Sequence, residues 1–137
     1  MKDLTLLVGR IFLVAIFPIS AYYKYIQWAG ITKAVANAGL PYPEYVSMLG
    51  TGVEFILPIL VVLGLFTRWA ALGLIVYVVL ATYIGHPIWK VAPDAYFANL
   101  MSFMKNLGMV GGLLMLMAFG PGRLAVQPSH TEEYATA

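Results

Sequence analysis

Two charged residues lie inside long apolar stretches of the chain and are the first candidates for chemistry. Glu54 interrupts the apolar run 46–66, and Lys105 interrupts the run 100–119. A charge in the hydrocarbon of a bilayer costs at least ~2.5–3.5 kcal/mol on insertion scales, and ionisable residues in membranes mark functional sites by default. We therefore expect both side chains to face inward and toward each other.

The depth of these two residues supports a common site. Glu54 follows Pro43 by 11 positions, and Lys105 follows Asp94 by 11 positions. At 1.5 Å per residue each lies about 16 Å from its helix start. Other polar side chains fall in the same half of their segments: Ser20, Lys24, Tyr83, His86 and Asn106. The pattern predicts one polar pocket in the outer half of a helical bundle, which contacts a ligand or relays protons. The alternative is a buried Glu54–Lys105 salt bridge that only fixes helix register.

The composition determines the solvent in which these residues must be placed. The chain has 137 residues, of which 61% are hydrophobic and 10% are charged. Soluble domains have about 25% charged residues, so the bilayer is the expected environment. The net charge of +2 is too small and scattered for nucleic-acid binding. The absence of cysteine excludes disulfides, thiol redox centres and iron–sulfur clusters in this chain.

Four apolar segments, at about 4–26, 43–66, 69–86 and 94–119, are long enough to cross a bilayer. Their polar residues recur at helical rather than strand spacing. We predict an all-α fold, an integral membrane four-helix antiparallel bundle. A single transmembrane domain is expected over residues 1–127, followed by a polar C-terminal tail over 128–137. The first apolar run is too long for a cleaved signal peptide and is interpreted as a retained helix.

Turn residues separate the segments. The stretch 38–43 contains Gly39 and two prolines and breaks the chain before the second segment. Thr67 and Arg68 are expected to form a short turn before the third segment. His86 precedes a proline and ends that segment, and Asp94 is the expected N-cap of the fourth.

Prolines and glycines within the segments predict local geometry. Pro58 cannot donate to the carbonyl of Glu54, and Pro18 cannot donate to that of Val14, so kinks are expected at both places. Gly108 and Gly112 form a G-x-x-x-G pattern, which is typical of close helix packing and compatible with a homodimer.

The distribution of basic residues predicts orientation. The side of the termini carries Lys2, Arg10, Arg68 and Arg123, and the opposite side carries Lys24, Lys33 and Lys90. The positive-inside rule then predicts cytoplasmic termini. Arg10 either extends to the headgroups or pairs inside the bundle. His86 is one of two histidines, so we expect no metal site and no haem.

The chain resembles the DoxX-like family of small four-helix membrane proteins over most of residues 4–124. The matching elements are the Leu7-x-x-Arg10 start, Glu54, the block 63–72, the Lys105-Asn106 step and the closing residues 120–123. The resemblance implies a bacterial-type plasma (inner) membrane protein. Some members of this family are subunits of quinone-linked oxidoreductases, including thiosulfate:quinone oxidoreductase, and others belong to oxidative-stress complexes.

The leading hypothesis is therefore a subunit of, or accessory to, a quinone-linked oxidoreductase, with a quinone as the cofactor and a soluble or membrane redox partner. Glu54, Lys105, His86, Tyr83, Asn106 and Lys24 are the candidate pocket residues. Whether the chain is itself an enzyme stays open. Two alternatives stay open as well: a small non-enzymatic transporter or lipid- or small-molecule-binding membrane protein, and a membrane scaffold of a larger complex.

Overall fold

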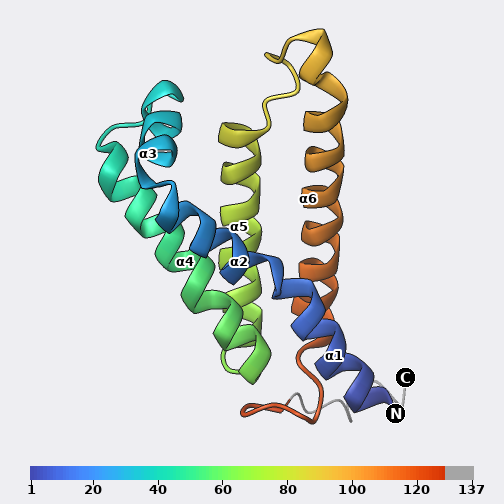
Figure 1. The fold of residues 1–137 in the computed structure, drawn as a ribbon. Helices are drawn as coiled ribbons and strands as arrows, with labels where there is room; N and C mark the ends of the chain where they lie inside the picture. The colour runs from blue at the N-terminus through green and yellow to red at the C-terminus, as the bar shows by residue number, and fades with distance from the viewer. Residues whose placement is uncertain (129–137) are drawn as a thin grey trace.

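A computed structural model describes residues 1–128 of the chain, and the predicted tail beyond them lies outside the described residues. The regular elements in this range are all helices (Figure 1). Four helical stretches are long and apolar enough to cross a membrane, Lys2–Ile26, Pro43–Leu63, Thr67–Gly85 and Pro93–Phe119. The predicted all-α membrane bundle of four spans is confirmed.

The first span is broken in its middle. It consists of α1 (Lys2–Val14) and α2 (Ile16–Ile26), with Ala15 between them. Pro18 has no N–H to donate to Val14, so the break falls where the sequence predicted a kink. A further helix, α3 (Trp28–Asn37), follows and packs against α4. The sequence analysis had not predicted a helix there.

The second and third spans form a tight hairpin. The helix α4 (Pro43–Leu63) ends at Gly64, which has a φ of 70°, and Leu65 N–H donates to Leu60 O at 2.9 Å. Glycine adopts this left-handed conformation without steric cost, so it terminates the helix. The helix α5 (Thr67–Gly85) begins directly after this turn. The turn therefore precedes Thr67, and its predicted position at Thr67 and Arg68 was wrong.

The fourth span, α6 (Pro93–Phe119), begins at a proline that follows Ala92 in an extended conformation. Proline is favoured at the first helical position because the N–H it lacks has no partner there. Asp94 lies in the first turn and is not the N-cap that the sequence predicted. Its charge still faces the positive end of the helix dipole.

The order of the helices around the bundle determines which side chains can meet. In Figure 1, α5 stands between α4 and α6, and it packs against both. The helix α2 crosses α4, whereas α6 approaches α1 near the termini. Within the described chain, neither α2 nor α4 makes a close backbone contact with α6. The buried apolar core is formed by Val14, Phe17, Val61, Ala70, Ala71, Leu74, Val78, Leu113 and Leu116.

The residues after α6 turn back toward α1 and the α4–α5 turn. In this return segment, residues 120–127, Val126 N–H donates to Leu63 O at 2.9 Å and Gln127 N–H donates to Gly64 O at 3.1 Å. Arg123 N–H donates to Asp3 Oδ1 at 3.1 Å. The return segment therefore closes the terminal side of the bundle.

Arg10 is the side chain that links α1 to this closure. It is 2% exposed, Nη1 donates to Val61 O at 3.2 Å, and Nη2 donates to Leu124 O. Of the two alternatives for Arg10, the structure therefore has it paired inside the bundle. A planar guanidinium suits this role because its N–H groups can reach two acceptors at once.

Candidate functional site

Three helices meet at the ammonium group of Lys24, near the end of α2. Its Nζ lies 2.8 Å from Oε2 of Glu54 on α4 and also donates to the Tyr77 hydroxyl on α5. Glu54 is 3% exposed, so its carboxylate has little access to solvent or lipid. A buried carboxylate requires a close counter-charge, and Lys24 provides it.

The predicted partner of Glu54 was wrong. Lys105 forms no ion pair with Glu54, because α5 separates α4 from α6 and the two helices make no close backbone contact. Equal depth on two parallel segments placed both residues at the same level but did not make their helices neighbours. Lys24 reaches Glu54 instead, since α2 crosses α4 directly.

A cavity of about 330 Å³ lies beside this ion pair, between α2 and α6. We call it the polar cavity. Its polar lining comes from all four spans: Ser20, Lys24, Glu54, Tyr77, His86, Lys105 and Asn106. The helices leave this space because α2 and α6 do not approach each other closely. Five of the six predicted pocket residues thus line one cavity, in the half of the bundle away from the termini.

Lys105 differs from Lys24, the other ammonium group of the polar cavity. Its side chain is exposed, and within residues 1–128 it has neither an ion pair nor a hydrogen bond. It therefore offers ammonium N–H donors that the described part of the chain does not use. A ligand in the polar cavity would meet one paired ammonium group, Lys24, and one unpaired one.

Asn106 is fixed by the neighbouring helix. Its Nδ2 donates to Thr82 Oγ1 at 2.8 Å, and Thr82 in turn donates to Val78 O at 2.6 Å. This chain of hydrogen bonds orients the amide at the wall of the polar cavity. The Asn106 carbonyl oxygen has no donor within the described residues and stays available as an acceptor.

His86 and Tyr83 diverge from each other. His86 lines the polar cavity, and its Nδ1 lies 3.3 Å from Oδ1 of Asn99, whose Nδ2 donates to Ala95 O at 3.0 Å. Tyr83 is 59% exposed and packs against Trp89, with ring centroids 5.4 Å apart. The structure therefore does not bring Tyr83 into the polar cavity.

Sequence reasoning missed Tyr77 and Asn99. A tyrosine hydroxyl in the middle of an apolar helix needs a hydrogen-bond partner, and this signal could have identified Tyr77. Asn99 lies two turns into α6 and carries no comparable signal, since asparagines near helix ends commonly meet water or backbone.

The two glycines predicted for helix packing have different surroundings. A Cβ on Gly112 would lie 2.7 Å from Leu13 Cδ1, so α1 and α6 come close there. A Cβ on Gly108 would meet nothing within 4 Å. Of these two glycines, only Gly112 lies at a close helix contact within residues 1–128. Among residues 1–128, no cluster of three or more histidine, aspartate or glutamate side chains could hold a metal ion.

Comparison with known proteins shows to which family this chain belongs. The profile of the DoxX family matches residues 5–87, which include Lys24, Glu54, Tyr77 and His86. The chain belongs to the DoxX family. This DoxX-family chain is 34% identical to the inner membrane protein YphA of Escherichia coli K12 over 125 residues, which cover 91% of the chain and 89% of YphA.

A second relative of this DoxX-family chain is the inner membrane protein YqjF of Escherichia coli K12. It is 28% identical over 126 residues, 92% of each chain. No solved structure matches the chain significantly. The family profile ends before α6, so Lys105 and Asn106 are covered by the two relatives and not by the profile.

Proposed function

We propose that this DoxX-family protein binds a quinone head group in the polar cavity and acts as a membrane subunit of, or accessory to, a quinone-linked oxidoreductase. The observation that carries the proposal is the unpaired ammonium group of Lys105 beside the Lys24–Glu54 ion pair in one small cavity. The family resemblance supports a quinone rather than a water-soluble ligand.

The residues of the polar cavity fit such a head group. Its carbonyl oxygens require donors, and Lys105 provides N–H groups that the described residues leave unused. Its ring requires apolar contacts, which Ile16, Phe17 and Met109 provide in the same lining. Cavities that bind small molecules commonly combine an apolar wall with a few polar groups that fix orientation.

The ion pair provides the groups for proton transfer. A bound quinone would supply two-electron, two-proton redox chemistry. In that chemistry Glu54 would relay the two protons, taking up each one and passing it to a quinone oxygen, so that the Lys24–Glu54 ion pair is restored. Since the chain contains no cysteine, the electrons in this proposal come from a partner chain or a diffusible reductant.

The proposed location is the inner membrane, with the termini in the cytoplasm. Both relatives are named inner membrane proteins. Arg10 is buried and Lys24 is ion-paired in the bundle, so neither belongs in the positive-inside comparison. The remaining basic residues still favour the side of the termini, with Lys2, Arg68 and Arg123 against Lys33 and Lys90.

Quinone titration in nanodiscs tests the head-group site. We expect a short-chain ubiquinone to bind the wild type and to bind Lys105→Met at least about tenfold more weakly, because hydrogen bonds to charged groups contribute about 1.5–3 kcal/mol. Glu54→Gln should weaken binding as well. Lys33→Met on α3 removes an exposed lysine outside the polar cavity and serves as the control.

Two results would overturn this assignment: no binding by the wild type, or equal binding by the wild type and both cavity variants. Proteoliposomes separate the remaining candidates. Ligand or proton flux without an electron donor would identify a non-enzymatic transporter. If the larger complex keeps its activity with the Glu54→Gln, Lys105→Met double variant, the protein is a scaffold of that complex.

A further inference from the structure

A groove leads from the polar cavity along the seam between α1 and α6. A cleft of about 550 Å³ shares Ile16, Lys105 and Met109 with the lining of the polar cavity. Nearer the termini, a pocket of about 620 Å³ shares Gly9 and Leu13 with that cleft. The three spaces therefore follow one another along the two helices, and we call the second and third together the seam groove.

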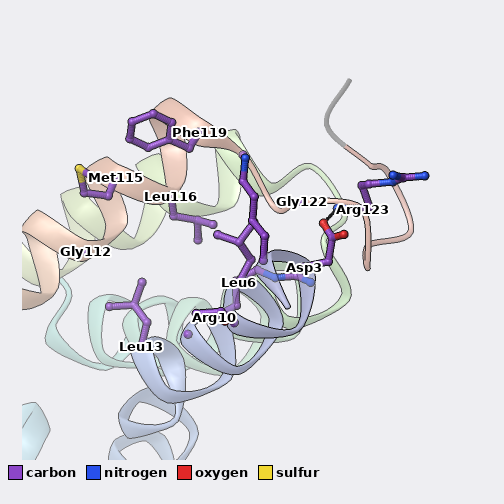
Figure 2. A pocket seen from close by; sticks show the side chains of 14 residues that line it. Asp3, Leu6, Arg10, Leu13, Gly112, Met115, Leu116, Phe119, Gly122 and Arg123 are labelled. Carbon is purple, nitrogen blue, oxygen red and sulfur yellow. Dashed lines mark hydrogen bonds between the residues drawn. The ribbon is translucent and has the colours of Figure 1, made fainter. Parts of the chain in front are cut away.

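The seam groove is lined mainly by apolar side chains, with the buried guanidinium of Arg10 partway along it and further charged residues at its far end. Figure 2 shows its terminal part, with Leu13 and Gly112 at one end and Asp3 and Arg123 at the other. Leu116 and Phe119 line the wall between them. The apolar part thus extends from Lys105 to Phe119, which is roughly 21 Å along α6 at 1.5 Å per residue.

Two glycines give the seam groove its width. A Cβ added to Gly9 on α1 or to Gly108 on α6 would meet no heavy atom within 4 Å. At Gly112, by contrast, Leu13 lies against the glycine, so the two helices are close there and the groove is narrower. Larger side chains at Gly9 or Gly108 would fill the space, so the sequence keeps it open with the smallest residue.

Lys105 lies where the seam groove meets the polar cavity and is part of both linings. Its exposed ammonium group has no partner among residues 1–128 and needs a polar acceptor at this point. A ligand could fit both features at once if its head group accepts a hydrogen bond from Lys105 and its long hydrocarbon tail lies in the seam groove toward Phe119.

We propose that the seam groove holds the isoprenoid tail of the quinone and that the head group enters the polar cavity sideways from the bilayer, between α1 and α6. This inference rests on the proposed function and extends it to the class of quinone and its route. A quinone with a long tail should bind more tightly than its tailless counterpart, because the seam groove holds the tail in place of lipid and orders it beside the polar cavity.

A comparison of two quinones in two variants tests the groove separately from the head-group site. The probes are 2,3-dimethoxy-5-methyl-1,4-benzoquinone, which has no tail, and ubiquinone-4, titrated in nanodiscs of fixed lipid composition. Gly108→Leu fills the groove. Gly111→Leu is the matched control, since Gly111 also has an open Cβ position on α6 but lies outside the groove lining.

We expect Gly108→Leu to weaken ubiquinone-4 binding about tenfold, the equivalent of roughly two lost methylene contacts, and to leave the tailless quinone unaffected. Gly111→Leu should bind both probes as the wild type does. Gly9→Leu, on the opposite wall, should reproduce the Gly108→Leu result and replaces that variant if it does not fold.

Each remaining outcome is decisive. Normal ubiquinone-4 binding in Gly108→Leu and Gly9→Leu overturns the groove while the head-group site stands. Equal loss of both probes shows that the glycines support the cavity and not a tail, which also overturns it. Absence of binding by either probe in the wild type overturns the groove together with the proposed function.

Discussion

The Lys24 ammonium lies 2.8 Å from the Glu54 carboxylate and joins α2 to α4 across 30 positions of sequence. The same ammonium donates to Tyr77 on α5, so three helices are held at one charged group. A pair of this kind is neutral as a unit, and the loss of either partner leaves a charge inside the bundle.

Removing Lys24 should therefore destabilise the protein more than removing any surface lysine. We expect Lys24→Met to lower the free energy of unfolding by about 3 kcal/mol, the low end of the range for buried pairs because Lys24 is partly exposed. Unfolding in mixed micelles measures the change, with Lys33→Met as the control. The double variant Lys24→Met, Glu54→Gln should recover part of the loss; a loss equal to that of Lys24→Met would argue against an ion pair.

Arg10 should control the order of the return segment, residues 120–127. Its guanidinium donates hydrogen bonds to the carbonyl oxygens of both Val61 and Leu124. The ammonium group of a lysine cannot reach both oxygens with the same geometry. We expect Arg10→Lys and Arg10→Leu to increase amide hydrogen exchange at Val126 and Gln127 by at least about fivefold. Arg68→Gln, an exposed arginine nearby in α5, should leave exchange unchanged. Unchanged exchange in both Arg10 variants would contradict the link.

Gly64 should tolerate no side chain. It has a φ of 70°, and a Cβ there would lie 2.6 Å from Arg10 Nη1. We expect Gly64→Ala to destabilise the protein by more than about 1 kcal/mol, from backbone strain and from displacement of the guanidinium. Gly52→Ala, inside α4 with an open Cβ position, should be neutral or slightly stabilising. Thermal unfolding in detergent compares the two, and similar stabilities would refute the steric argument.

The orientation can be tested cleanly because the chain has no cysteine. Asn37→Cys lies at the end of α3, and Val126→Cys lies in the return segment; both positions are exposed. In intact spheroplasts, an impermeant maleimide should label Asn37→Cys and not Val126→Cys. The reverse pattern would place the termini outside and would reverse the side on which the polar cavity lies.

The spans could be predicted from the sequence because long apolar runs with helical spacing have few other solutions in a bilayer. The order of the helices around the bundle was harder to predict. The sequence gives the depth of Glu54 and Lys105 in the membrane, but it does not show that α5 separates their helices. The prediction that Lys105 is the partner of Glu54 was therefore wrong. Lys24 was predicted for the pocket, yet its contact with Glu54 depends on the crossing of α2 over α4.

Contacts made by the backbone could not be predicted from the sequence either. The return segment donates main-chain hydrogen bonds to Leu63 and Gly64, which any residue type except proline could form. The helix α3 was missed because its ten residues are too few to read as a span, and the glycine and prolines at 38–43 suggested a longer loop. Tyr77 was the one omission that a rule on tyrosine hydroxyls could have prevented.

The Arg10–Leu124 contact has a consequence for biosynthesis. The two residues are separated by 114 positions, so the ribosome delivers α1 long before the acceptor that completes its arginine. The carbonyl of Val61 becomes available to the guanidinium with α4, whereas its second acceptor comes only with the return segment. A chain that ended before Leu124 would leave Nη2 of Arg10 without this acceptor, so the closure of the terminal side of the bundle is completed by residues that are synthesised after all four spans.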